Sequence, residues 1–369
     1  MKRKLLAFGL IIALLFTIAV GCASDSDEPE KPAAPVEDPA DDTEDDDTEE
    51  PATGGDYKVG MVTDEGGVND QSFNQSAYEG LQRAEEELGV TIGYQESNVT
   101  ADFNPNFEIL LDAGNEMIWG IGFKLHDAVL AAAKNNPDTF YGIIDSELAE
   151  PLDNAVSVLF RQEQPSFLVG YIAGMMTETN EVGFVGGVES GVIEQFEYGY
   201  RAGVQYAAAE RGVDIEVAVQ YAESFTDATI GRSIATNMYQ QGADVIFHAA
   251  GGAGDGVIAA ASEEGKWVIG VDRDQHDIAP EVVLTSAMKR VDVGVFNVTE
   301  QFVNGEFPAG EVVTYGLADG GAVDIAPTSD VHVPQEILDS VEEIKQLIID
   351  EEIVVPLDEA SYNEFVEAL

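Results

Sequence analysis

The residues best suited to chemistry in this chain are aromatic rings and carboxylates. Asp64 follows a short apolar run that begins at Val59, and Phe73 and Asn74 follow it closely, with the hydroxyl of Ser72 beside them. An aromatic ring offers a face for stacking, and carboxylate and amide oxygens accept hydrogen bonds from ring N–H and amino groups. This combination suits a flat polar molecule better than a phosphate.

Further candidates follow later apolar runs, at points where parallel strands would end. They are Asp145, Phe225, Gly251, Gly252, Asp272 and Lys289. In two-lobed doubly wound proteins the carboxyl ends of the strands converge on one cleft. Phe73 and Phe225 would then stack on the two faces of a planar heterocycle, at roughly 1–3 kcal/mol per face. Asp145 or Asp64 would accept hydrogen bonds from a purine edge, and Asp272 with Lys289 would pair around ribose hydroxyls.

Each of these residues also has a purely structural interpretation. From spacing alone, Phe73 fits the buried face of a helix better than a ligand platform, and Phe225 fits a packing contact between elements as well as it fits stacking. Asp145 and Asp272 fit helix caps, and Lys289 fits a solvated charge. The spacing leaves these alternatives open.

The chain lacks the patterns expected of a catalytic or metal site. Its four histidines occur in no HExxH or HxH spacing, and Cys22 is its single cysteine. The glycines of Gly251–Gly256 match no phosphate-binding motif, so close backbone approach to a ligand is favoured over a phosphate cradle. No GxSxG elbow is present. We therefore expect no catalytic residue, no metal and no cofactor; a Rossmann-like enzyme is the disfavoured alternative.

The composition is strongly acidic. The 369 residues include 70 Asp and Glu against 17 Lys and Arg, and 15 of the acidic residues lie in residues 23–56. Such a surface repels nucleic acid, which we exclude as a partner. A cationic ligand is one explanation of the acidity. The favoured one is a solvated surface adapted to high salt, and thus a halophilic source, because the excess is spread over every segment.

The N-terminus has the layout of a lipoprotein signal peptide, which we assign to residues 1–22. Three basic residues precede the apolar run Leu5–Val20, and the sequence Ala-Val-Gly-Cys ending at Cys22 resembles a lipobox. Acylation of Cys22 would anchor the protein to the lipid bilayer, on the extracytoplasmic face of the cell membrane. A transmembrane anchor with an incidental cysteine is the alternative. We expect residues 23–56 to be a disordered acidic linker.

The rest of the chain predicts an α/β protein in which strands alternate with helices. The expected strands are Val59–Val62, Thr91–Tyr94, Met117–Ile121, Phe140–Ile144, Ala155–Leu159, Val182–Val185, Ile215–Val219, Val245–Phe247, Trp267–Val271, Val282–Thr285 and Val312–Leu317. The expected helices are Phe73–Leu88, Phe107–Gly114, Asp127–Lys134, an all-round apolar helix near Phe167–Met176, Glu194–Arg211, Ala228–Gln241, Gly254–Glu264, Val291–Val303 and one opened by Pro334. Two series of similar length indicate two doubly wound lobes joined near residues 160–166.

Several segments resemble one known family. TDEGGVNDQSFNQ at residues 63–75 resembles the opening of the basic membrane protein (BMP) family of lipoproteins, best known from purine nucleoside receptors of bacterial ABC importers. QEQPSFLVGYIAG at 162–174, DVIFHAAGGAGDGV at 244–257, WVIGVDRDQ at 267–275 and VLTSAMKRVDV at 283–293 continue the resemblance in the same order. It covers nearly all of residues 57–356.

The resemblance implies a type I periplasmic-binding-protein fold with a hinge and a cleft. One lobe would comprise 57–160 plus about 287–312, and the other 161–286 plus about 313–369. It implies that Phe73 and Phe225 stack on a base, that Asp145 reads the base, and that Asp272 and Lys289 hold the sugar. Ser72 stands where the family allows Asn, and its shorter hydroxyl reaches less far.

The resemblance also implies a function. The protein would capture a nucleoside, a purine nucleoside first of all, by closure of its lobes, and it would act as a monomer. It would deliver the nucleoside to a permease of an ABC importer. A sensor lipoprotein that uses the same pocket to signal to a membrane receptor, or a protein that binds another polar solute such as a sugar, is the alternative.

Overall fold

The structure is a computed structural model that describes residues 57–369, which lie within one compact unit. The predicted signal peptide, the lipidation site Cys22 and the acidic linker 23–56 lie outside the described residues. Within the described part, no helix combines the length and the apolar character needed to cross a bilayer.

The first lobe is built on a parallel sheet whose strand order is β11-β5-β4-β3-β1-β2. Its first strands and helices are β1 (Lys58–Val62), α1 (Phe73–Leu88), β2 (Thr91–Gln95), α2 (Phe103–Asp112), β3 (Met117–Gly120), α3 (His126–Asn135), β4 (Phe140–Ile144) and β5 (Ala155–Phe160). Central strands such as β3 are wholly buried because helices cover both faces of the sheet.

The second lobe repeats this plan with the order β12-β10-β9-β8-β6-β7, in which only β12 runs antiparallel. Its elements are α4 (Glu163–Met176), β6 (Glu181–Gly186), α5 (Gly191–Arg211), β7 (Glu216–Tyr221), α6 (Ala228–Gln241), β8 (Val245–Ala249), α7 (Ala253–Glu264), β9 (Trp267–Asp272), β10 (Val283–Lys289), β12 (Val323–Ile325), α9 (Gln335–Ile349) and α10 (Glu359–Ala368). The apolar helix α4 is buried over most of its length, as its sequence predicts.

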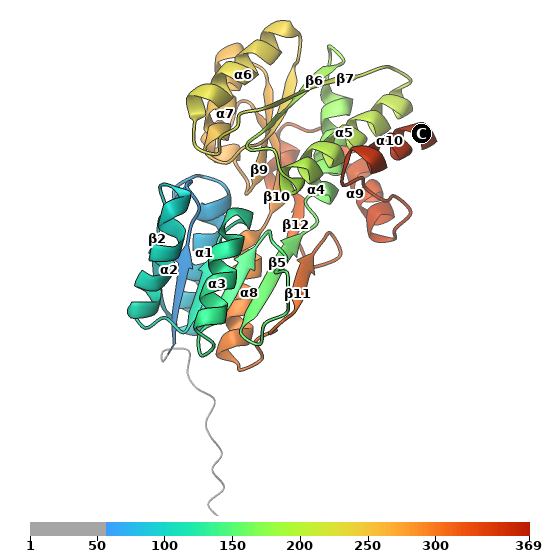
Figure 1. Ribbon diagram of the computed structural model, residues 1–369. Helices are drawn as coiled ribbons and strands as arrows, with labels where there is room; N and C mark the ends of the chain where they lie inside the picture. The colour runs from blue at the N-terminus through green and yellow to red at the C-terminus, as the bar shows by residue number, and fades with distance from the viewer. Residues whose placement is uncertain (1–56) are drawn as a thin grey trace, which may run out of the picture. The chain divides into compact units, whose positions relative to one another are not determined.

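Two late elements return to the first lobe: α8 (Val291–Val303) and β11 (Val312–Tyr315). Figure 1 shows both of them beside elements from the N-terminal part of the chain. Helix α8 packs on α1, where Gly80 is required because a Cβ there would lie 2.5 Å from the carbonyl oxygen of Asp292. The chain therefore crosses between the lobes three times: after β5, after β10 and after β11.

These crossings correct the lobe boundaries expected from the sequence. Strand β10 belongs to the second sheet up to Lys289, two residues beyond the expected change at 287. Strand β11 belongs to the first sheet, although residues from 313 onward were expected in the second lobe. The reason is pairing: α8 returns the chain to the free edge of β5, and Val312 pairs in parallel with Ser157.

The strand–loop–helix unit at the start of the fold is confirmed, and its turn has a clear physical cause. The Asp70 carboxylate accepts hydrogen bonds from the backbone N–H groups of Ser72, Asn74 and Gln75 at 2.9–3.0 Å, which satisfies donors in the first turn of α1. Gly89 ends the helix in the left-handed conformation, at φ 75°. The carboxyl end of β1 and the first turn of α1 are thereby held next to each other.

Candidate ligand-binding site

A cavity lies between the two lobes, where strands of both sheets reach their carboxyl ends. It is lined by Asp64, Gly66, Asp70, Phe73, Asn74, Gly122, Phe123, Lys124 and Asp145 from the first lobe, and by Val192, Ile193, Phe196, Phe225, Ala249, Gly251, Val271, Asp272 and Lys289 from the second. Its empty space, counted out to the open mouth, is about 590 Å³.

Most residues predicted for the site line this cavity, and two do not. Ser72 and Gly252 are absent from the lining. Ser72 is fully buried and donates its hydroxyl hydrogen bond to Asp272, while Gly252 directly precedes α7. Sequence reasoning missed the aromatic residues Phe123 and Phe196. Phe123 follows β3 closely, so the rule that ligands bind at strand ends would have found it.

The two phenylalanines predicted to stack come from different lobes and line the same cavity. Phe73 is the first residue of α1, and a Cβ at Gly122 would lie 3.3 Å from its ring. Phe225 lies against Gly187, where a Cβ would lie 2.2 Å from the ring. Each ring therefore rests against a glycine of its own lobe, and a side chain at position 187 would displace the Phe225 ring.

Lys289 is the most enclosed cation of the site. Its side chain is 1 % exposed, and its ammonium group forms an ion pair with Asp145 of the other lobe. The rings of Phe73, Phe160 and Phe196 surround the ammonium with centroids 5.0, 5.5 and 5.6 Å away. Charge pairing and cation–π attraction together offset the cost of burying this charge.

Lys289 and Asp272, which the sequence predicts to hold a sugar together, each bond a side chain of the first lobe. Lys289 ends β10 in the second sheet, and its ammonium reaches across the cleft to the loop after β4. Asp272 instead accepts a hydrogen bond from the Ser72 hydroxyl of the first lobe. Burial raises the pKa of Asp272 to about 7, although the charge of Lys289 acts in the opposite direction.

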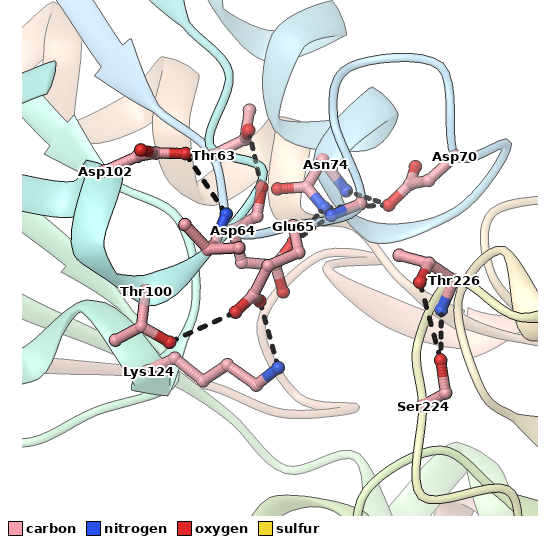
Figure 2. Close-up of polar contacts among 12 residues, drawn as sticks. Thr63, Asp64, Glu65, Asp70, Asn74, Thr100, Asp102, Lys124, Ser224 and Thr226 are labelled. Atoms are coloured by element: carbon pink, nitrogen blue, oxygen red, sulfur yellow. Dashed lines mark hydrogen bonds and ion pairs between the residues drawn. The ribbon is translucent and has the colours of Figure 1, made fainter.

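A second polar group lies at the start of α1. The amide nitrogen of Asn74 donates to Asp64 at 2.8 Å and to Asp70 at 2.9 Å, and Figure 2 shows Asn74 directed toward Asp70. These two acceptors fix the orientation of the amide. Its oxygen is buried and has no hydrogen-bond partner among the described residues. Burial raises the pKa of Asp64 to about 6, while the Gly66 N–H and Asn74 lower it.

Lys124 spans the site near Phe225. Figure 2 shows its ammonium directed at Glu65, 3.0 Å away, and the Thr100 hydroxyl on the other oxygen of that carboxylate at 3.3 Å. The same ammonium lies 5.1 Å from the centre of the Phe225 ring. Lys124 therefore connects a charged pair of the first lobe with an aromatic ring of the second.

No group of three or more His, Cys, Asp or Glu side chains within residues 57–369 is arranged to hold a metal ion.

Comparison with known proteins decides the family. Residues 57–359 match the profile of the Bmp family, described as ABC transporter substrate-binding protein PnrA-like. The chain belongs to this family. Its members are substrate-binding proteins of ABC transporters and not enzymes, so the chain has a small-molecule ligand and a permease partner by family membership.

Individual relatives agree with this assignment. A CD4+ T-cell-stimulating antigen of Listeria innocua is 43% identical over 322 residues, which cover 82% of this chain and 88% of the relative. The ABC transporter nucleoside-binding protein BmpA of Lactococcus lactis is 40% identical over 82% of this chain and 89% of its own length.

A solved structure of similar fold comes from Aeropyrum pernix and is described as ABC transporter system solute-binding proteins. It matches with a TM-score of 0.75 and 30% identity, covering 85% of this chain and 98% of that one. The fold is accordingly that of type I periplasmic binding proteins, with two doubly wound lobes.

Proposed function

We propose that this BMP-family protein captures a nucleoside, in the first instance a purine nucleoside, between its two lobes and passes it to the permease of an ABC importer. The observation that carries the proposal is that Phe73 and Phe225, one from each lobe, line a single cavity together with buried carboxylates. Stacking of a base on aromatic rings is worth roughly 1–3 kcal/mol per ring. The nucleoside-binding relative from Lactococcus lactis supports the same ligand class.

The polar groups of the cavity suit the edges of a nucleoside. Asp64 and the unpartnered oxygen of Asn74 are acceptors for ring N–H or amino groups. Asp145, Asp272 and Lys289 supply acceptors and a donor for sugar hydroxyls or the base edge. A ligand donor at Asn74 would satisfy a buried amide oxygen that has no hydrogen-bond partner among the described residues.

The charges favour a nucleoside over a nucleotide. The cavity is lined by four carboxylates, and its two lysines are already paired with Glu65 and Asp145. A phosphate would have to displace one of these carboxylates or lie among them without a free cation. Like charges placed close together in a buried site are costly.

Capture would proceed by closure of the lobes. In this structure the lobes are in contact through Lys289 and Asp145, through Ser72 and Asp272, and through Arg273 with Glu79 at 3.2 Å. A ligand that touches both rings gains those contacts only in the closed form, so it shifts the population toward closure. We further propose that acylated Cys22 holds the protein at the extracytoplasmic membrane surface.

A thermal-shift panel tests the ligand class. The secreted protein lacking residues 1–22 would be screened at high salt against nucleosides, free bases, nucleotides, sugars and amino acids. We expect the melting temperature to rise most with purine nucleosides and little with their 5′-phosphates. A rise with sugars or amino acids alone would overturn the proposal.

The anchor is tested separately. Wild-type cells should hold the protein in the membrane fraction, and Cys22→Ser should release it or leave its leader uncleaved. Mass spectrometry of the N-terminal peptide should find acyl chains on Cys22, and an unmodified thiol there would contradict the anchor.

A further inference from the structure

A further contact between the lobes, outside the cavity, is made by Gln71 and Gln275. Gln275 is 1 % exposed, and its side chain is held by its own lobe. Its Oε1 accepts a hydrogen bond from the Val271 N–H at 3.0 Å, and its backbone N–H donates to the Ser286 hydroxyl at 3.1 Å. The side-chain amide is thereby fixed before any contact with the first lobe is made.

The nitrogen of the Gln275 side-chain amide points across the cleft. Its Nε2 donates a hydrogen bond to the backbone carbonyl of Gln71 at 3.0 Å. Gln71 has a φ of 54°, in the left-handed region, and the Asp70 carboxylate holds the turn that follows it. Donor and acceptor are therefore each preformed in a different lobe, and they meet only when the lobes are together. Neither residue lines the ligand cavity.

Gln71 directly precedes two residues of the site, so its contact with Gln275 affects their positions. The next residue is Ser72, which bonds Asp272 across the cleft, and the one after it is Phe73, whose ring lines the cavity. A hydrogen bond at the Gln71 carbonyl thus sets how closely Phe73 approaches the second lobe. The Gln71 side chain adds a longer contact, 3.5 Å, to Asp255 of that lobe.

We propose that Gln275 is a positioning residue for ligand capture, which holds the Gln71 carbonyl so that Phe73 stacks at the correct distance from the second lobe. This inference rests on the proposed nucleoside function. It assigns to Gln275 a role in the lifetime of the closed complex without contact with the ligand.

The isosteric variant Gln275→Glu tests the role. A carboxylate keeps the acceptor for the Val271 N–H but loses the donor and places negative charge against the Gln71 carbonyl. At pH 8 we expect the dissociation constants for adenosine, guanosine and inosine to rise about tenfold, mainly through faster dissociation, given the usual strength of one hydrogen bond. Gln240→Glu, which adds the same charge at an exposed site on α6 of the same lobe, should bind like wild type.

The pH dependence of nucleoside binding by Gln275→Glu distinguishes a positioning role from a merely structural one. At pH 5.5 protonation of the carboxyl group introduced by Gln275→Glu restores a donor, so the ratio of variant to wild-type dissociation constants should narrow to about threefold or less. The ratio is used because the pKa values of Asp255 and Asp272, raised by burial to about 6 and about 7, make these nearby groups titrate in both proteins. His248, the buried imidazole near Gln275, has its pKa lowered to about 4 by burial and stays neutral across this range.

A pair of substitutions at Gln71 leaves the second lobe unchanged. Gln71→Gly retains the positive φ and should bind within about threefold of wild type, whereas Gln71→Val disfavours it, turns the carbonyl away and should bind about tenfold more weakly. If Gln275→Glu melts at a lower temperature without ligand, its weaker binding could reflect lost stability, and the two Gln71 variants then provide the test of the positioning role. Equal affinity of the two Gln71 variants, or wild-type affinity of folded Gln275→Glu at pH 8, would overturn the inference. Failure of wild type to bind any nucleoside would instead overturn the proposed function.

Discussion

Asp145 and Asp272 occupy corresponding positions in the two lobes, and both have a left-handed backbone, with φ of 63° and 64°. Asp145 follows β4 and Asp272 ends β9, which are the third strands in the two sheet orders. Aspartate is one of the few residues besides glycine that adopt this conformation readily. Each carboxylate bonds a side chain of the opposite lobe, Lys289 for Asp145 and Ser72 for Asp272.

The contributions of Asp145 and Lys289 to stability should be strongly coupled, because the two residues form a buried ion pair across the cleft. Asp145→Asn keeps the backbone conformation but removes the ion-pair partner of Lys289, and loss of one partner of a buried pair costs about 3–5 kcal/mol when nothing compensates it. The nearby carboxyl group of Asp272 and opening of the lobes to water reduce this cost. In urea unfolding we expect Asp145→Asn to be destabilised by more than about 1 kcal/mol and the double variant with Lys289→Met to lose less than the sum of the single changes. The exposed pair Lys134–Glu150 is the control, where Glu150→Gln should cost less than about 1 kcal/mol. Additive effects at Asp145 and Lys289 would contradict the coupling.

The stacking rings should dominate nucleoside affinity. Phe73→Ala and Phe225→Ala each remove one stacking face, so calorimetry should show binding weakened about tenfold or more in each variant. Phe365→Ala is the control: its ring packs on Phe167, with the ring centroids 5.8 Å apart, and neither residue lines the cavity. This variant should bind with unchanged affinity. Wild-type affinity in both cavity variants would exclude stacking of the ligand between Phe73 and Phe225.

Buried carboxyl groups should make the protein less stable as the pH rises from 4 to 7. Burial raises the pKa of Asp272 from 3.8 to about 7, so in this range the folded protein binds a proton that the unfolded chain has released. Stability then falls with rising pH until the folded form has also ionised, and this contribution is constant above about pH 7. Urea unfolding should show a smaller loss between pH 5 and 8 for Asp272→Asn than for wild type, by more than about 1 kcal/mol. The exposed variant Asp138→Asn should follow the wild-type profile, and an identical profile for Asp272→Asn would refute the assignment.

The acidic surface should make the fold depend on salt. The chain carries a formal charge of −53, and its self-repulsion is screened over about 10 Å at 0.1 M salt and over about 3 Å at 1 M. We expect the melting temperature to rise from low salt to molar KCl, as for a protein adapted to a saline environment. Sucrose at matched osmolality is the control, because it raises stability without screening charge. Indifference to KCl would argue against such adaptation.

Helices α4 and α5 should tolerate no side chain where they cross. A Cβ at Gly203 would lie 2.0 Å from the carbonyl oxygen of Phe167, so Gly203→Ala must push the helices apart. Overpacking of this kind costs about 1–3 kcal/mol, which urea unfolding would detect. Gly191→Ala in the same helix meets nothing within 4 Å and should be neutral or slightly stabilising. A stable Gly203→Ala protein would show that the crossing can relax.

Regular elements were predictable where periodicity or end signals were strong. The bounds of α6 and α8 agree with the expected helices Ala228–Gln241 and Val291–Val303. Helix α2 begins at Phe103, four residues before its expected start, because Pro105 is acceptable in a first helical turn. Helix α10 was not expected, since Tyr362 is its one buried residue and leaves no apolar stripe to recognise.

The sequence did not predict which side chains bond each other across the cleft. Placing candidates at strand ends brought Asp64, Phe73 and Phe225 into one cavity, because that rule depends on topology alone. The pairing of Lys289 with Asp145 depends on the angle at which the lobes meet, which no local pattern encodes. For a related reason β11 was misplaced: its four residues show which faces are covered but not which sheet edge they join.

The late return of α8 and β11 to the first lobe constrains the order in which the protein matures. Residues 57–160 on their own lack the strand that covers the edge of β5 and the helix that packs on α1, so a nascent chain presents an unfinished lobe until about residue 315 has emerged. Most of the second lobe, from α4 to β10, is synthesised within that interval, and β12, α9 and α10 follow it. Completion of either lobe therefore waits for nearly the whole polypeptide, and the contacts that complete each lobe join residues far apart in the sequence, which slows folding.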